Sequence, residues 1–150
     1  MAFFEIGIDY SAELISKAKN RVKNAKVLKM NFLKKLKFDD EEFDGVWASA
    51  SLLHIPKNSL NNVVLEIKRI LKTNGIFFIS VKEGKKEKMV KDDYGSETRF
   101  FSFFKKKELI KKLEILGFQV PYSYEVPDEK LRVRSKKKKQ KWIILYSVKQ

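Results

Sequence analysis

An acidic residue at the end of an apolar stretch is the first feature of this sequence that could bind a ligand. The stretch is FFEIGI, residues 3–8, and Asp9, Tyr10 and Ser11 follow it directly. A carboxylate in this position can accept hydrogen bonds from both vicinal hydroxyls of a ribose. An acid there is also a common start of a helix, with no ligand involved. Asp9 alone is compatible with both interpretations.

Three further polar stretches follow apolar segments in the same way. They are Met30–Phe32, Ala48–His54 and the residues after Val81. In an open α/β sheet, ligands bind beyond the carboxyl ends of the strands, near the point where the strand order reverses. If the apolar segments are parallel strands, these stretches and Asp9 lie at that edge. The sequence therefore predicts a ligand site there.

Apolar periodicity predicts the elements that would hold these residues. The expected strands are 3–8, 25–29, 43–48, 76–81, 118–124 and 141–147. The expected helices begin at Ser11, at Asn58 or Ser59, and at Lys105; the second closes at Gly75 and the third stops at Gly117. Residues 82–98 are predicted to form a polar loop. This alternation favours one α/β domain over residues 1–150, with a mostly parallel sheet and one antiparallel strand near the C-terminus.

Composition sets limits on the class of protein. The chain has 150 residues, of which 43% are hydrophobic and 35% charged, as expected for one globular domain. No apolar run reaches the length of a membrane span, and the first residues do not resemble a secretory signal. The sequence has no Cys and a single His. We therefore expect a cytoplasmic protein without a disulfide or a bound transition metal.

The net charge of +14, from 33 basic and 19 acidic residues, would attract anions, and nucleic acid is the obvious partner. The run from Lys130 to Lys141 contains eight basic residues and no acid. It is either a solvated hairpin loop or an arm that binds phosphates. Most of the cations are Lys rather than Arg, which favours a merely solvated surface.

Ordered segments across nearly the whole chain resemble the class I S-adenosylmethionine-dependent methyltransferases. They are EIGIDYSAELISKAKNR, VLKMNFLKKLKF, EEFDGVWASASLLHI, LEIKRILKTNGIFFIS and RFFSFFKKKELIKKLEILGF, in that order. The resemblance implies a Rossmann-like seven-stranded sheet whose last strand is antiparallel. It also implies methyl transfer from S-adenosylmethionine to an acceptor that the sequence does not identify.

The resemblance also implies which residues bind the cofactor: Asp9, Tyr10, Asn31, Phe32, Ala48 and Ser49. Asp9 would bind the ribose hydroxyls, and Tyr10 would pack on the adenine. Asn31 stands where the family often has an Asp, but an amide oxygen can accept the same hydrogen bond. Phe32 would offer its backbone N–H to the ring. Ala48 and Ser49 would border the methionine end.

Two residues are candidates for binding the methyl acceptor. His54 matches a His that is common in the family after this strand, although a lone His is more often structural. Arg99 could attract an anionic group of the acceptor, or could form a surface salt bridge. Asp44 begins its strand, at the edge away from the ligand, and is expected to be structural. No residue is assigned as a general base.

The family's first strand and its glycine-rich turn, acid-x-G-x-G, have no counterpart in this sequence. We therefore expect a methyltransferase sheet that lacks its first strand. A separate polypeptide, direct pairing of strands 3–8 and 43–48, or a second copy of the chain could fill the gap.

The missing turn and the charge favour one alternative function, a non-catalytic nucleic-acid-binding or adaptor protein on this fold. The Asp9 signal also permits a nucleotide-dependent dehydrogenase. The segment FDGVWASASLLHI and the terminal antiparallel strands argue against that enzyme.

Overall fold

The computed structural model describes residues 4–91, 98–128 and 140–150. Its internal contacts divide the chain into two compact units, residues 1–37 and residues 38–150. A single domain over residues 1–150 stays a prediction.

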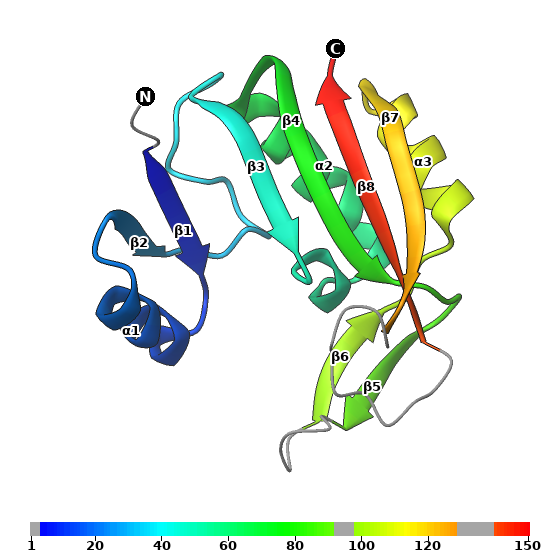
Figure 1. Cartoon of the computed structure of the whole chain (residues 1–150), viewed down its shortest axis with the longest axis horizontal. Helices are drawn as coiled ribbons and strands as arrows, with labels where there is room; N and C mark the ends of the chain where they lie inside the picture. Colours follow the sequence, from blue (N-terminus) through cyan, green and yellow to red (C-terminus); the bar gives the residue numbers. More distant parts are fainter. Residues whose placement is uncertain (1–3, 92–97, 129–139) are drawn as a thin grey trace. The chain divides into compact units, whose positions relative to one another are not determined.

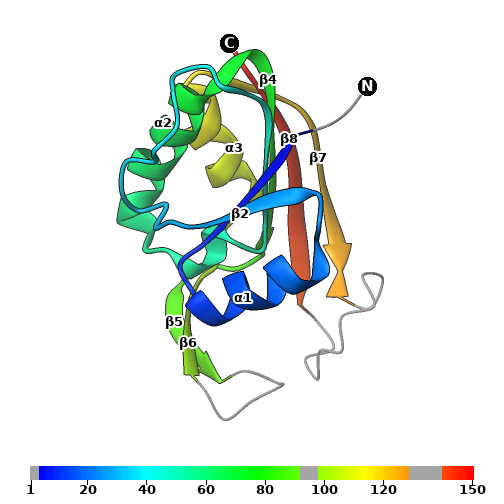
Figure 2. The same ribbon diagram turned by 90° about the vertical axis from the view of Figure 1, so that its left-hand side faces the viewer.

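The first unit is a β–α–β unit, as its sequence predicts. Strand β1 (Glu5–Asp9) pairs in parallel with β2 (Ala25–Lys29), and helix α1 (Ala12–Arg21) connects them (Figure 2). The Ser11 hydroxyl accepts a hydrogen bond from the backbone N–H of Leu14 at 3.3 Å, which caps the first turn of α1. The predicted helix start and both strands are confirmed.

The second unit is built on a four-stranded sheet in the order β3-β4-β8-β7 (Figure 1). These strands span Phe43–Ser49 (β3), Leu71–Lys82 (β4), Phe118–Pro127 (β7) and Lys141–Lys149 (β8). Strand β3 is parallel to β4, and β8 is antiparallel to both of its neighbours. This sheet therefore has one antiparallel strand, next to the C-terminus, as the sequence predicts.

Two helices cover one face of this sheet. Helix α2 (Leu60–Ile70) and helix α3 (Lys106–Ile115) lie on the same side of it (Figures 1 and 2). The core lies between the helices and alternate strand residues, all fully buried: Phe77, Ile79, Val81, Ile143 and Leu145. Alternation of this kind commits one face of each strand to the core.

The arrangement of the strands differs from the single, mostly parallel sheet that the sequence predicts. The described strands form three sheets, and these are mixed, with antiparallel pairs among the later strands. Strand β1 pairs with β2, and β3 pairs with β4, each within its own unit; direct pairing of strands 3–8 and 43–48 stays a prediction. The coarser prediction, an α/β fold, holds.

The end of the second helix differs from the sequence prediction. Helix α2 ends at Ile70, and β4 begins at Leu71, which pairs with Phe43 and is completely buried. Gly75 lies within β4, where a Cβ atom would be 2.8 Å from the carbonyl oxygen of Lys72. This glycine permits a close approach of the backbone and does not cap the helix.

The prediction of a loop over residues 82–98 is also wrong in part. Strand β5 (Glu87–Lys91) pairs in antiparallel fashion with β6 (Thr98–Ser102) in a small separate sheet. The sequence of β5, EKMVK, has little apolar content to indicate a strand. Its pairing depends on contacts with distant residues, such as the hydrogen bond from the backbone N–H of Lys57 to Glu87. Among the described residues, no helix is long and apolar enough to cross a membrane.

Candidate cofactor and acceptor sites

The ends of β1 and β2 place Asp9 and Asn31 close together in the first unit. The backbone N–H of Met30, next to Asn31, donates a hydrogen bond to the carbonyl oxygen of Asp9 at 3.0 Å. The carboxylate Oδ1 of Asp9 accepts from the backbone N–H of Ser11 at 2.7 Å. This bond fixes the side chain, and a carboxylate can accept several more hydrogen bonds. Asp9 therefore has the capacity to hold ribose hydroxyls.

The other predicted adenosine residues lie beside these two. Tyr10 is 67% exposed, and the ammonium nitrogen of Lys29 is 5.7 Å from its ring centroid. The side-chain oxygen of Asn31 accepts from the backbone N–H of Leu33 at 3.0 Å, so a local turn already uses one of its acceptor sites. A second lone pair can still accept a proton from an adenine amino group. Phe32 is half-buried.

In the second unit, β3 ends in a tight arrangement of hydroxyl groups. The Ser49 hydroxyl lies 3.1 Å from that of Ser80 on β4. The backbone N–H of Ala50 donates to the Ser80 hydroxyl at 2.9 Å and to its carbonyl oxygen at 3.1 Å. Ala50 has a φ of 52°, which is strained for a residue with a side chain. Ala48 is buried one residue earlier.

Sequence reasoning missed Ser80. Its signal was a single hydroxyl in the otherwise apolar strand IFFISV. The side chain is 5% exposed, and its hydrogen bonds join the carboxyl ends of β3 and β4. A buried polar group of this kind holds the backbone at the edge where a ligand is expected.

His54 lies in the short helix η1 (Leu52–His54) that follows β3. Its Nδ1 is 3.0 Å from the carbonyl oxygen of Phe100, and its ring contacts that of Phe101 with centroids 4.7 Å apart. A carbonyl only accepts hydrogen bonds, so Nδ1 carries the proton in this bond. In the neutral ring, Nε2 is then the acceptor nitrogen. His54 therefore fixes the hairpin and offers an acceptor atom.

Arg99 is an exposed residue of β6, where it pairs in register with Val90 of β5. The hairpin that holds it is anchored by two residues that sequence reasoning did not single out. The Ser102 hydroxyl donates to the carbonyl oxygen of Ile55 at 2.5 Å, and Glu87 accepts from the backbone N–H of Lys57 at 2.5 Å. Both anchors tie β5 and β6 to the segment after β3. The structure thus brings the hairpin of Arg99 against the helix of His54.

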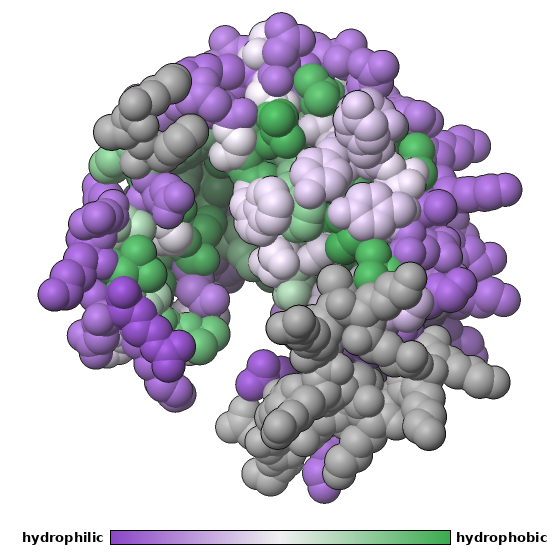
Figure 3. Space-filling view, viewed as in Figure 1, coloured by the Kyte–Doolittle hydropathy of each residue, from purple (hydrophilic) through white to green (hydrophobic). Residues whose placement is uncertain are grey.

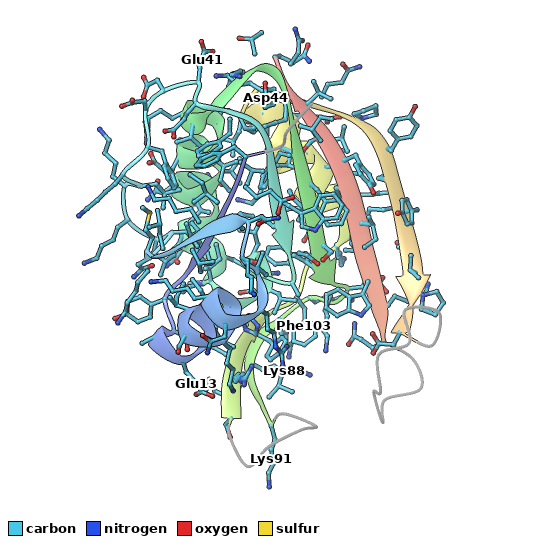
Figure 4. All side chains as sticks on the ribbon, turned by 60° about the vertical axis from the view of Figure 1, so that its left-hand side comes forward. Glu13, Glu41, Asp44, Lys88, Lys91 and Phe103 are labelled. Carbon is cyan, nitrogen blue, oxygen red and sulfur yellow. The ribbon has the colours of Figure 1, made fainter. Side chains whose placement is uncertain are left out.

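Asp44 lies at the start of β3, at the opposite end of the sheet from Phe103 (Figure 4). Its carboxylate is 2.8 Å from the ammonium group of Lys72, which lowers the pKa of Asp44 by a hydrogen bond and by charge. These contacts agree with the structural role that the sequence predicts.

The basic run Lys130–Lys141 lies outside the described residues, apart from its last two. Of these, Lys141 places its ammonium group 3.3 Å from a carboxylate oxygen of Glu125.

The predicted cofactor residues fall into two groups, one in each unit. Asp9, Tyr10, Asn31 and Phe32 belong to the first unit, and Ala48 and Ser49 to the second, with His54 and Arg99. In both units, the predicted cofactor residues lie at or just after the carboxyl ends of parallel strands, whereas Arg99 lies in the antiparallel pair of β5 and β6. That arrangement, with the antiparallel strand β8, defines the class of protein as a methyltransferase-like α/β fold.

The methyltransferase domain family matches residues 3–79, just over half of the chain, and the chain belongs to this family. It is an S-adenosylmethionine-dependent methyltransferase whose acceptor is unknown. The search of the curated proteins gives no match.

Solved structures share the fold at low sequence identity. An S-adenosylmethionine-dependent methyltransferase of Methanosarcina mazei is 20% identical, with 96% of this chain and 81% of that chain covered and a TM-score of 0.80. A Burkholderia thailandensis 1,6-didemethyltoxoflavin-N1-methyltransferase, with S-adenosylhomocysteine bound, is 19% identical, covers 96% and 60%, and has a TM-score of 0.72. A Haloferax volcanii putative methyltransferase, in complex with the Trm112 activator, is 16% identical, covers 97% and 71%, and has a TM-score of 0.71.

Proposed function

We propose that Asp9, Tyr10, Asn31 and Phe32 bind the adenosine part of S-adenosylmethionine, and that Ala48 and Ser49 border its methionine end. The single observation that carries this proposal is the fixed carboxylate of Asp9. It sits at the end of β1, held by the N–H of Ser11 and beside the segment of Asn31. The exposed ring of Tyr10 supports the same assignment, because an adenine needs an open planar surface on which to pack.

The methyl acceptor, in this proposal, binds at the carboxyl ends of β3 and β4 beside the hairpin of β5 and β6. The cofactor supplies a methyl group on a sulfonium, which is already strongly electrophilic. The chain's own residues then have to align a nucleophile with it and exclude water. The Nε2 of His54 can accept a hydrogen bond from the acceptor, and Arg99 can attract an anionic group on it.

We further propose that full cofactor affinity requires a polypeptide that completes the sheet. The sequence contains no acid-x-G-x-G turn, so the backbone N–H groups that such a turn would offer to the methionyl carboxylate are missing from these residues. A methyltransferase of the same fold from H. volcanii is seen with an activator protein. That complex supports a partner for this chain without identifying it.

Calorimetric titration of the chain with S-adenosylhomocysteine tests the proposed function. We expect a binding isotherm that tightens when the sheet is completed, because the adenosine residues are present and the methionyl turn is not. Absence of binding, both alone and with a completing segment, would overturn the proposal. It would favour the alternative, a nucleic-acid-binding or adaptor protein, for which the net charge of +14 is the supporting observation.

A titration of the chain with RNA at several salt concentrations tests the alternative function directly. If single-stranded RNA is the partner, its affinity should fall steeply as the salt concentration rises, since counterion release then contributes less. Replacing Lys136–Lys139 with Gln should flatten that dependence. An affinity for RNA that does not change with salt would favour the other interpretation of the run Lys130–Lys141, a solvated loop.

A further inference from the structure

Lys82 holds its cationic group against two aromatic rings at the carboxyl end of β4. Its ammonium nitrogen is 5.2 Å from the ring centroid of Phe101, on β6, and 5.4 Å from that of Trp142, on β8. Lys82 pairs in register with Trp142, and its carbonyl oxygen accepts from the backbone N–H of Phe104 at 3.1 Å. Hydrogen bonds therefore fix the backbone of this residue, and the rings attract its ammonium group.

A second cation lies against the same group of rings. The ammonium nitrogen of Lys88, on β5, is 4.9 Å from the ring centroid of Phe103, and the two side chains lie together in Figure 4. The rings of Phe101 and Phe103 are themselves stacked, with centroids 6.1 Å apart. The ammonium groups of Lys82 and Lys88 thus border one pair of stacked rings.

These two cations have no anionic partner within residues 4–91, 98–128 and 140–150, since neither forms an ion pair there. Lys72 and Lys149, by contrast, each lie against a carboxylate. The buried acid next to Trp142 is Asp128, and its Oδ1 accepts from the indole N–H and not from Lys82. A cation that rings shield partly from water, and that no carboxylate neutralises, attracts an anion more strongly than a solvated one.

Lys82 lies close to the residues that we assign to the methyl acceptor and to the methionine end. It is two residues beyond Ser80 on the same face of β4, and the Ser80 hydroxyl is 3.1 Å from that of Ser49. The ring of Phe101, which Lys82 faces, also contacts the ring of His54, with centroids 4.7 Å apart. Two residues of a strand span about 7 Å, comparable with the length of one substituted aromatic ring. The cation therefore lies about one ring beyond the proposed methionine end.

The contacts at the hairpin fit a small acid better than a nucleic acid. A single strand is bound by stacking successive bases on exposed rings, but Phe103 is only 8% exposed and Phe104 only 5%. Exposed rings of the second unit, such as those of Trp47 and Tyr122, lie on β3 and β7 instead. Pale side chains accordingly gather over the strands of the four-stranded sheet in Figure 3. The rings beside Lys82 are too enclosed to stack a run of bases.

We propose that the methyl acceptor is a small aromatic acid whose carboxylate or phosphate binds the ammonium group of Lys82, with Lys88 adding to the positive potential. The proposal rests on the proposed function, because it names the class of acceptor at the same site. The nucleophile is an oxygen or nitrogen on the ring of the acid. Its lone pair forms the bond to the methyl carbon while the carbon–sulfur bond breaks. The electron pair of that bond stays on sulfur, which leaves S-adenosylhomocysteine, and the proton of the nucleophile goes to solvent.

The test compares acids with their uncharged amides on the full, isotope-labelled chain. The probes are para-hydroxybenzoate with para-hydroxybenzamide, and nicotinate with nicotinamide; phenyl phosphate tests a phosphate as the anion. Backbone amide shifts of residues 80–88 and 98–104 report binding, with and without S-adenosylhomocysteine. We expect at least one carboxylate to bind about tenfold more tightly than its amide, because the amide lacks the hydrogen bond between two charged groups. Tighter binding of phenyl phosphate than of both carboxylates would support the proposal with a phosphate as the anion.

Substitutions of the lysines locate the bound anion. Lys82→Met should abolish the preference for acids, because Met keeps an unbranched side chain against the rings and removes the charge. Lys82→Arg keeps the charge and the contact with the rings, so it should keep the preference. Lys88→Met should reduce the preference less than Lys82→Met does. Lys111→Met, at an exposed lysine of α3, is the matched control. An unchanged preference in Lys82→Met would overturn the proposal.

The remaining outcomes separate this proposal from the proposed function. Equal affinities of each acid and its amide in the parent chain, or no binding of either, would overturn the proposal; binding of S-adenosylhomocysteine in the same samples would leave the proposed function standing. Acid binding that depends on Lys82, without any binding of S-adenosylhomocysteine, would support the anion site and reject the proposed function. Shifts caused by single-stranded RNA and by none of the acids, and removed by Lys82→Met, would overturn the proposal in favour of a nucleic acid.

Discussion

The Nδ1 of His54 and the carbonyl oxygen of Phe100 lie 3.0 Å apart, although 46 residues separate them in the sequence. This bond joins the segment after β3 to strand β6. It also determines which nitrogen of the ring remains an acceptor. The sequence left open whether His54 is structural or binds the methyl acceptor. In the structure, its Nδ1 makes a structural hydrogen bond, and its Nε2 can accept a hydrogen bond from another group.

Replacing His54 with Phe should loosen the hairpin without emptying the space that the ring fills. The variant keeps an aromatic contact with Phe101 but loses the donor to Phe100. Loss of one hydrogen bond corresponds to about 0.5–1.5 kcal/mol, so amide exchange in β6 should become roughly two- to thirteenfold faster. Hydrogen exchange of residues 98–102 measures this. The exposed Lys107→Gln on α3 should have no effect, and unchanged exchange in His54→Phe would contradict the prediction.

Replacing Asp9 with Ala should weaken the binding of S-adenosylhomocysteine by about 1–3 kcal/mol, because charged hydrogen bonds to the ribose are lost. Calorimetry with the full chain measures the affinity. Asp44→Asn provides the control, since Asp44 is an acid at the far end of β3 that pairs with Lys72. Equal affinities in the parent chain and in Asp9→Ala would reject the ribose assignment.

Two exposed carboxylates should make the second unit less stable in acid. Lys149 and Thr73 lower the pKa of Glu41 by hydrogen bonds, and Lys72 lowers that of Asp44. A lowered pKa in the folded state stabilises the fold above the ordinary carboxyl pKa, and this stabilisation is lost as the pH falls through the lowered value. Thermal unfolding, measured from pH 7 to pH 2, tests this. At neutral pH, the variants Glu41→Gln and Asp44→Asn should each be less stable than the parent chain. The difference should disappear at the acidic end; a constant difference would contradict the linkage.

Gly117 should not tolerate a side chain. Its φ of 85° lies in the left-handed region, directly after α3, and its N–H donates to the carbonyl oxygen of Glu114 at 3.0 Å. Gly117→Ala should lower the free energy of unfolding by about 1 kcal/mol, as measured by urea denaturation. Gly45→Ala is the control, because a Cβ atom there meets only the carbonyl oxygen of Ile76 at an ordinary 3.6 Å. Similar stability of the two variants would refute the strain argument.

The sequence by itself determined the elements whose signals are local. Helix α1 begins after Ser11 because a serine hydroxyl can cap the turn that follows it, and α3 ends before Gly117 because glycine alone adopts that backbone conformation at little cost. The strands over residues 25–29 and 76–81 were recognisable from their own apolar pattern. The polar residues after β1, β2 and β3 were found by the same logic, because strand ends can be located without knowing which strands pair.

Only the tertiary structure decided the features that depend on distant residues. Leu71 begins β4, and does not continue α2, because it pairs with Phe43 and its carbonyl oxygen accepts from the ammonium group of Lys149. The hairpin of β5 and β6 is held by hydrogen bonds to His54, Ile55 and Lys57, and no local sequence pattern predicts these bonds. The contacts of Trp47 on β3 with Phe78 on β4 and Tyr146 on β8 likewise require the register of three strands. Side chains from Trp47 to Tyr146 meet only after pairing, and the energy of pairing depends on both strands at once.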